Sequence, residues 1–170
     1  MDADMASDIR LVLLCGTSFS GKSTVARYLA PRLSARIVSL DEINERRGLW
    51  GGDGIPAEEW IRTHEVASDE VRGLLTSGTS VIVDDTSSLR FLRDGWRSLA
   101  ASARARFSLI YVDVDHATVR RRRADNQLDP RRRDVADAVL DQHLAEFEPP
   151  QDDENAVRVE AADDLQDLTI

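Results

Sequence analysis

Eight residues near the start of the chain limit its fold more than any others. They read Gly16-Thr17-Ser18-Phe19-Ser20-Gly21-Lys22-Ser23 and have the spacing G-x-x-x-x-G-K-[ST]. The apolar run Ile9–Cys15 precedes them, and apolar residues at helical spacing follow from Val25 to Leu33. A buried strand, a glycine-rich loop and a helix in this order form a phosphate-binding loop, or P-loop. The sequence therefore predicts that a nucleotide binds here through its phosphates.

The residue types of this loop suit phosphate chemistry. Gly16 and Gly21 lack a Cβ, so consecutive backbone N–H groups can point at phosphate oxygens, and the following helix adds its N-terminal donors. Lys22 is the only lysine in the chain; we expect it to act catalytically on the β- and γ-phosphates, and Ser23 to ligate Mg2+. The predicted nucleotide-binding residues of the loop are Gly16, Thr17, Ser18, Phe19, Ser20, Gly21, Lys22, Ser23 and Thr24.

The length and composition predict one domain over residues 1–170. The chain has 170 residues and 42% hydrophobic content, enough for a substantial core. Cys15 is the only cysteine, which excludes an intrachain disulfide. The acidic start lacks the basic and apolar regions of a signal peptide, and no apolar run approaches the roughly 18 residues of a membrane span. We therefore expect a cytoplasmic protein without a membrane partner; the oligomeric state is not predicted.

Charge is unevenly distributed along the chain. The net charge is −9, and from Glu146 onward nine acidic residues face a single basic one, Arg158. The segment 151–170 is thus an acidic C-terminal segment, and the rest of the chain is close to neutral. A generally basic surface is missing, which disfavours a nucleic-acid partner. The three histidines are scattered without metal-ligand spacing, so zinc chemistry is not expected.

Apolar periodicity predicts an alternating pattern of strands and helices. Further strands are expected at 36–40, 81–83, 107–112 and 155–159. Helices are expected at about 56–78, from a cap at Ser87 or Ser88 to about Ser102, from a cap at Asp115 to Asp129, and at 135–147. This order predicts an α/β protein with the three-layer P-loop NTPase fold, a five-stranded parallel sheet flanked by helices.

Carboxylates follow three of the first four predicted strands, where ligands bind in open parallel sheets. Asp41 ends the second strand on the side expected for an acceptor molecule, and we interpret it as a general base that accepts a hydroxyl proton. Asp84 and Asp85 follow the third strand in the manner of a Walker B motif. One of the two is expected to hold Mg2+ together with Ser23, and the sequence does not decide which. Asp113 and Asp115 are interpreted as helix caps or loop acids.

Seven arginines form two clusters, Arg120 to Arg123 and Arg131 to Arg133. A transferring phosphoryl group spreads negative charge that arginine can pair with, so these residues predict a helical lid at about 120–134. We expect Arg120 and Arg123 to contact the nucleotide, with Arg123 in a catalytic role, while Arg131 to Arg133 are further candidates. Four consecutive helical residues span more than a full turn, so only one or two of the first cluster can reach the site.

These motifs resemble the small P-loop kinases of the adenylate-kinase-like fold, and among them the predicted kinases of the AAA_33 type. The resemblance rests on Gly16–Thr24, Leu40–Glu42, Val81–Thr86 with Arg90 and Arg93, Arg123–Asn126 and Phe147–Pro150, and it spans about residues 9 to 160. The chain is similar in this way to chloramphenicol phosphotransferase, gluconate kinase and polynucleotide kinase domains. The resemblance implies ATP as cofactor, transfer of its γ-phosphate to a hydroxyl, Asp41 as base, Arg123 in the lid, and adenine binding by the loop before the fifth strand.

The family phosphorylates diverse acceptors, so the resemblance leaves the substrate open. Its polynucleotide kinases carry an arginine three residues after the base, where this chain has Asn44. We therefore expect a small-molecule hydroxyl acceptor. The alternatives are a polynucleotide or RNA 5'-hydroxyl kinase, with Arg46 and Arg47 as substitutes for the missing arginine, and a switch that binds and hydrolyses ATP without acting as a kinase. Trp50, in a glycine-rich loop, is interpreted either as stacking on the acceptor or as packing on the core.

Overall fold

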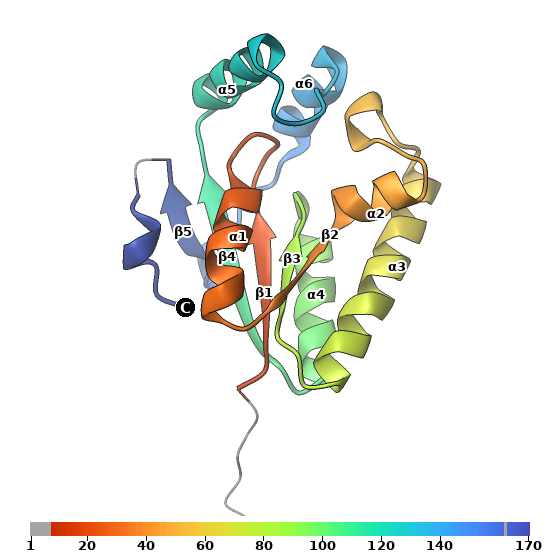
Figure 1. Cartoon of the computed structure of the whole chain (residues 1–170), viewed down its shortest axis with the longest axis vertical. Coiled ribbons are helices and arrows are strands. Elements are labelled where there is room, and N and C mark those ends of the chain that lie inside the picture. Colours follow the sequence, from red (N-terminus) through yellow and green to blue (C-terminus); the bar gives the residue numbers. More distant parts are fainter. Residues whose placement is uncertain (1–7, 162) are drawn as a thin grey trace, which may run out of the picture.

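The protein is described by a computed structural model that covers residues 8–161 and 163–170. Within this part, the strands form a single parallel sheet in the order β2-β3-β1-β4-β5. They are β1 (Arg10–Cys15), β2 (Arg36–Ser39), β3 (Val81–Asp84), β4 (Arg106–Asp113) and β5 (Val157–Glu160). The predicted five-stranded parallel sheet is confirmed, and β1, which leads into the P-loop, occupies its centre (Figure 1).

Helices connect the strands and cover both faces of the sheet. They are α1 (Lys22–Arg32), α2 (Leu40–Arg46), α3 (Ala57–Thr76), α4 (Arg90–Ser102), α5 (His116–Leu128) and α6 (Asp137–Glu146). Helix α1 lies on the near face in Figure 1 and α4 on the far face. No helix among the described residues is long and apolar enough to span a membrane.

Alternate residues of β1 enter opposite layers of the core. Leu11 and Leu13 pack in a cluster that contains buried residues of α3 and α4, whereas Val12 and Leu14 pack with buried residues of α1, α5 and α6. Successive strand residues point to opposite faces, so a continuous apolar run gives a strand buried on both sides. This burial fixes the end of β1, and with it the position of the P-loop.

Helices α5 and α6 extend beyond the carboxyl ends of the strands, above the P-loop (Figure 1). Helix α5 begins where predicted, because the Asp115 carboxylate accepts a hydrogen bond from the backbone N–H of Thr118 at 2.8 Å. The segment 129–136 joins α5 to α6 and carries the second arginine cluster. The predicted lid region thus lies over the edge of the sheet where the candidate site is found.

Two predicted boundaries are wrong. Leu40 was expected to end a strand but begins α2, because the Ser39 hydroxyl accepts a hydrogen bond from the Glu42 N–H at 3.3 Å and caps the helix. Asp41 therefore lies in the first turn of a helix. Neither Ser87 nor Ser88 caps α4; its N-cap is Leu89, which offers no side-chain hydrogen bond. Ser87 instead bonds to Asp85.

Candidate active site

The P-loop wraps tightly around the end of β1. Gly16 approaches β4 so closely that a Cβ on it would lie 2.7 Å from the carbonyl oxygen of Val112, and its N–H donates to the Thr86 carbonyl at 3.1 Å. Gly21 has φ +103 and leads directly into α1. A side chain at position 16 would collide with β4, and residues with side chains rarely adopt the φ of Gly21. Both positions therefore require glycine. The two positions chosen from the sequence therefore shape the loop as expected.

Lys22 and Ser23, the first residues of α1, face the end of β3. The Ser23 hydroxyl donates to Asp84 at 2.7 Å, and the Lys22 ammonium donates to the Thr17 carbonyl at 2.8 Å. Desolvation lowers the pKa of Lys22, while the carboxylates of Asp84 and Asp41 oppose that shift. The structure thus brings together the lysine, the hydroxyl and the carboxylate that the motif predicts.

Asp84 and Asp85 have different environments. Asp85 is buried, and its carboxylate accepts hydrogen bonds from both the N–H and the hydroxyl of Ser87, each at 3.0 Å. Asp84 instead points at Ser23. Asp84 therefore contacts the P-loop hydroxyl, whereas Asp85 holds the turn after β3. The described residues contain no group of three or more His, Cys, Asp or Glu side chains arranged for a metal.

Asp41 lies in the same cleft as Lys22. Its pKa is raised, mainly by desolvation, against the lowering influence of the nearby cations Lys22 and Arg132. Gly51 keeps room beside it, since a Cβ there would lie 3.3 Å from the Trp60 ring and 3.8 Å from an Asp41 oxygen. A carboxylate whose pKa is shifted toward neutrality is better matched to proton acceptance.

The cleft has a volume of about 2060 Å³. The P-loop and the segment 131–133 line one part of it, and α2, α3 and the start of α4 line another. Asp41 lies in the part formed by α2. Pockets for single drug-sized ligands measure about 300–1,000 Å³, so the cleft has room for a nucleotide and a second molecule.

The arginines of the two clusters that line the cleft are Arg122, which the sequence did not single out, and Arg131 to Arg133, which were further candidates; Arg120 and Arg123 do not line it. Arg122 donates to the carbonyls of Phe19 and Ser20 at 3.0 and 2.9 Å, and the Arg132 guanidinium lies 4.4 Å from the centre of the Phe19 ring. Arg131 and Arg133 also line the cleft. In this structure the P-loop is therefore approached by Arg122 and by the second cluster.

Arg120 and Arg123 are held in ion pairs outside the cleft lining. Arg120 pairs with Asp141 at 2.7 Å, and Arg123 pairs with Asp137 and, at 3.0 Å, with Asp134. These pairs join α5 to α6 and to the segment before it. The partner acids lie 11 or more residues further along the chain, so no local pattern distinguishes Arg122 from its neighbours.

Two positions left open by the sequence have defined contacts. Trp50 is 8% exposed, its N–H donates to the Asp134 carbonyl at 2.8 Å, and Arg133 stacks on its ring at 4.7 Å. It packs against the segment 133–134 while still lining the cleft. Asn44 is fully buried and accepts a hydrogen bond from the Thr63 hydroxyl at 2.6 Å. Its side chain therefore serves the packing of α2 on α3.

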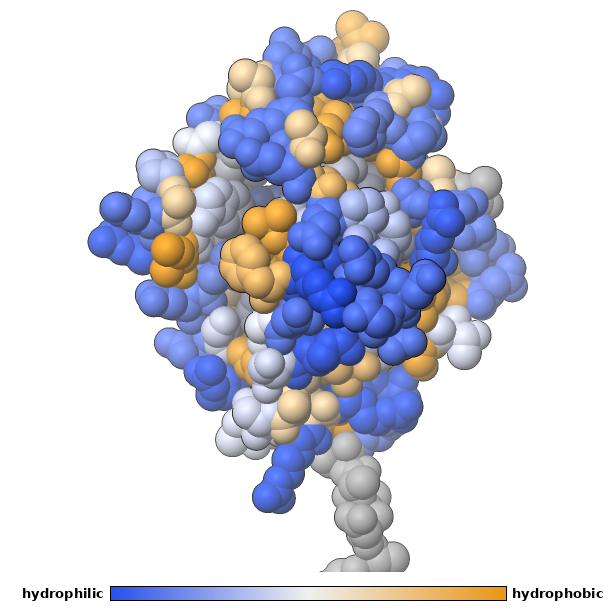
Figure 2. Space-filling view, turned by 180° about the vertical axis from the view of Figure 1, so that it is seen from behind, coloured by the Kyte–Doolittle hydropathy of each residue, from blue (hydrophilic) through white to orange (hydrophobic). Residues whose placement is uncertain are grey.

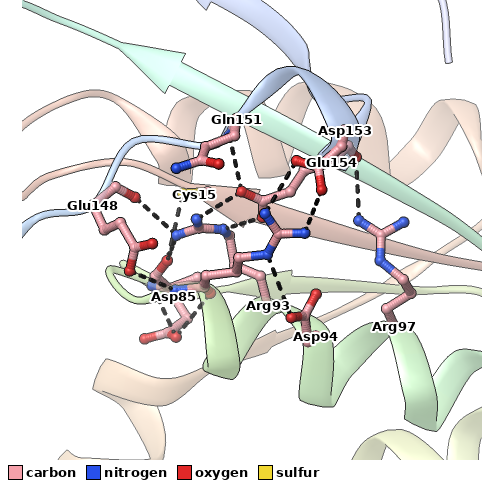
Figure 3. A network of polar contacts seen from close by, with 11 residues as sticks. Cys15, Asp85, Arg93, Asp94, Arg97, Glu148, Gln151, Asp153 and Glu154 are labelled. Carbon is pink, nitrogen blue, oxygen red and sulfur yellow. Dashed lines mark hydrogen bonds and ion pairs between the residues drawn. The ribbon is translucent and has the colours of Figure 1, made fainter.

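A buried arginine of α4, Arg93, connects two segments next to the site, and the sequence analysis assigned it no role. Arg93 is fully buried and makes a two-pronged ion pair with Glu154 at 2.7 and 2.9 Å (Figure 3). It also donates to the carbonyls of Ser87 and Glu148 at 3.0 and 2.9 Å. Arg93 thus ties the turn after Asp85 to the segment that runs from α6 to β5. A partner 61 residues away leaves no signal in the local sequence.

Together, the central P-loop, the Ser23–Asp84 pair and the sheet order define a nucleotide-binding P-loop protein with a kinase-like fold. The chain belongs to the AAA domain family AAA_33, which it matches over residues 11–150. The resemblance predicted from the motifs is confirmed.

A sequence relative is the "Protein KTI12 homolog" of Arabidopsis thaliana, 31% identical over 151 residues. The match covers 83% of this chain and 48% of the relative, so the chain spans about half the length of that protein.

Solved structures share the fold. A sugar kinase from Janibacter sp. HTCC2649 superposes with a TM-score of 0.70 at 18% identity, covering 93% of this chain and 88% of that one. The APS kinase CysC of Mycobacterium tuberculosis, in complex with AMPPNP and APS, gives 0.68 at 20% identity and covers 93% and 91%. Kti12 of Chaetomium thermophilum, in complex with ADP-AlF3, gives 0.70 at 18% identity and covers 91% and 90%.

Proposed function

We propose that this protein transfers the γ-phosphate of ATP to a hydroxyl group of a small molecule. The observation that carries the proposal is the continuation of the cleft past the P-loop into a region lined by α2, α3 and α4, with Asp41 on its wall. An enzyme that only hydrolysed ATP would need space for water alone. The fold shared with a sugar kinase and an APS kinase supports the same conclusion.

The reaction follows from the positions of the charged groups. The acceptor oxygen attacks the γ-phosphorus, the bond from that phosphorus to the β,γ-bridging oxygen breaks, and ADP leaves. The hydroxyl proton passes to Asp41, whose raised pKa suits it to receive one. Lys22, Arg122 and Arg132 supply positive charge around the P-loop for the phosphoryl oxygens.

The residues around Ser23 fit Mg2+. A hydroxyl and a carboxylate oxygen converge there at 2.7 Å, and Mg2+ at nucleotide sites takes one or two protein oxygens together with phosphate oxygens and water. Ser23 and Asp84 would hold the ion, which would neutralise charge on the β- and γ-phosphates. The small number of protein ligands also explains why no larger acidic cluster is needed.

A second candidate is an ATP-hydrolysing switch. It is favoured by the similarity to the KTI12 homolog and by the fold shared with Kti12, which was solved with ADP-AlF3. In such a protein water is the nucleophile and Asp41 has no alcohol to deprotonate. The role of Asp41 therefore separates the two candidates. A polynucleotide kinase is less well supported, because Asn44 is buried against Thr63 and does not face the cleft.

The test is ADP release with ATP and Mg2+ in the presence of a panel of alcohols, sugars, sugar acids, nucleosides and 5'-hydroxyl oligonucleotides. We expect at least one small molecule to raise turnover about tenfold or more, because a bound alcohol replaces water as nucleophile. Asp41→Asn should abolish this stimulation, and Lys22→Ala should abolish ADP release altogether. Thr76→Ala, an exposed change at the end of α3 outside the cleft lining, is the control and should leave ADP release and its stimulation unchanged.

ADP release that no acceptor stimulates and that Asp41→Asn leaves unchanged would support the switch instead. Stimulation by oligonucleotides alone would support the 5'-hydroxyl kinase.

A further inference from the structure

The region of the cleft beyond Asp41, here named the acceptor chamber, has its own chemical character. Its walls are α2, one side of α3 and the start of α4. On α3 the residues Ile61, Glu65 and Ser68 line the chamber, while the alternate stripe from Thr63 to Leu75 is buried against the sheet and its neighbours. The inference drawn from this chamber rests on the proposed function.

Three glutamates of the acceptor chamber have no basic partner. Glu42 and Glu45 on α2 and Glu65 on α3 line the chamber and are exposed to it, and none of them takes part in an ion pair among the described residues. Neighbouring acids behave differently, since Glu70 pairs with Arg46 and Glu59 pairs with Arg47. The unpaired negative charge is therefore concentrated where an acceptor would lie.

The arginines near the chamber differ in their contacts: Arg132 lies over the Phe19 ring on the P-loop side, whereas Arg72 and Arg133 face carboxylates. Arg72 is the basic residue that α3 contributes to the lining, and it pairs with Asp69 at 3.0 Å. Arg133, from the lid segment, lies 3.9 Å from Asp53 and stacks on Trp50. An anionic acceptor would thus meet unpaired carboxylates without an uncommitted cation on α2 or α3, which disfavours its binding electrostatically.

The chamber also presents apolar and aromatic surface. Ile61 is 59% exposed and Phe91 is 68% exposed, and the Trp60 ring lines the same wall. The molecule is otherwise mainly hydrophilic on the side formed by α3 and α4, with separate hydrophobic areas (Figure 2). Aromatic faces attract ammonium groups through their quadrupole, and their area favours apolar contact. Aromatic rings and unpaired carboxylates around one space recognise a protonated amine by two independent effects.

We propose that the acceptor is a hydroxyl compound that also carries a protonated amine beside an apolar or aromatic group. The amine lies among Glu42, Glu45 and Glu65, and the apolar part packs on Ile61 and Phe91. The hydroxyl then points toward Asp41, at the junction between the chamber and the P-loop. The same glutamates disfavour sugar acids and other anionic acceptors.

The test compares three probes that share a phenyl ring and a benzylic hydroxyl but differ in charge. They are 2-amino-1-phenylethanol (cationic), 1-phenyl-1,2-ethanediol (neutral) and mandelate (anionic). Their dissociation constants are measured by calorimetry at pH 7 on the full chain with AMPPNP and Mg2+. We expect the amine to bind at least about tenfold more tightly than the diol, and mandelate to bind more weakly than the diol.

Substitution of the glutamates tests whether they cause the preference for the amine over the diol. The triple variant Glu42→Gln, Glu45→Gln and Glu65→Gln should reduce the preference for the amine over the diol to below about threefold, because amide side chains keep the shape and remove the charge. Glu58→Gln is the matched control: it removes an exposed glutamate of α3 that does not line the cleft, and the preference should persist.

Each outcome bears on the inference. Equal or tighter binding of the diol or of mandelate overturns it, as does a preference that survives the triple variant or a failure of all three probes to bind. Failure of the proposed function is separate: it would appear as tight, glutamate-dependent amine binding without any acceptor-stimulated ADP release. ADP release that is stimulated by acceptors but shows no preference for amines would refute the proposed cationic acceptor and leave the proposed kinase activity standing.

Discussion

Replacement of the buried Arg93 by methionine should destabilise the protein strongly. Arg93 is fully buried and makes four hydrogen bonds, two to Glu154 and one each to the carbonyls of Ser87 and Glu148. Arg93→Met keeps most of the volume but leaves the Glu154 carboxylate, itself 2% exposed, without its cation. Breaking a buried pair by removing one partner costs about 3–5 kcal/mol, a large part of the stability of a typical domain.

The assay is the free energy of unfolding from urea denaturation. Arg90→Met is the matched control on the same helix, because Arg90 pairs with Asp153 at the surface at 2.6 Å and is 36% exposed. Such exposed pairs are screened by water and contribute little to stability. The double variant Arg93→Met, Glu154→Met removes both charges and should recover part of the loss, since apolar replacement of a whole buried pair is often tolerated.

The effect also has a defined pH dependence. The hydrogen bonds from Arg93 hold the pKa of Glu154 below its usual range. A depressed folded-state pKa gives stability that is present above the unfolded-state pKa, about 4.3, and is lost as the pH falls through the folded-state value. The difference in the free energy of unfolding between wild type and Arg93→Met should therefore shrink as the pH falls below about 4.3. A loss in Arg93→Met no larger than that in Arg90→Met would refute this reasoning, as would a double variant that costs as much as Arg93→Met and a single Glu154→Met variant together.

Three further predictions concern the site. Asp84→Asn should raise the Mg2+ concentration for half-maximal ADP release at least about tenfold, because one anionic ligand is lost; an unchanged Mg2+ titration would exclude Asp84 as a ligand. In Arg132→Ala the acid limb of the kcat/KM profile should move to higher pH, since Arg132 lowers the pKa of Asp41; a shift to lower pH would contradict that assignment. Burial raises the pKa of Cys15 to about 12, so iodoacetamide at neutral pH should modify the folded protein at least about a hundredfold more slowly than the urea-unfolded chain, because the thiolate is the reactive form. Mass spectrometry over time checks this, and equal rates would mean that the thiol is accessible.

The sheet and the P-loop could be predicted because their signals are local. The apolar run from Leu11 to Cys15 is buried on both faces of the sheet, and the glycine spacing that follows it is typical of a P-loop. The cap of α5 by Asp115 is equally local. Such features depend on residues within a few positions of one another.

Features that depend on distant partners could not be predicted. Ser87 is a good cap candidate by residue type, yet the neighbouring Asp85 takes its hydrogen bonds and α4 begins later. Arg122 reaches the P-loop while Arg123 turns to Asp134 and Asp137, and only the arrangement of α5 against α6 decides between them. The Arg93–Glu154 pair likewise exists only because the segment after α6 returns beneath α4.

The presence of a single lysine has a further consequence. Apart from a terminal amine, all amine-directed chemistry on this chain converges on the Nζ atom of Lys22. The lowered pKa of Lys22 makes its neutral, nucleophilic form more abundant than that of an ordinary surface lysine. Acylation of that one atom would remove the positive charge that lies within the P-loop, so a single covalent modification at a known position would test the proposed role of Lys22 in phosphate binding.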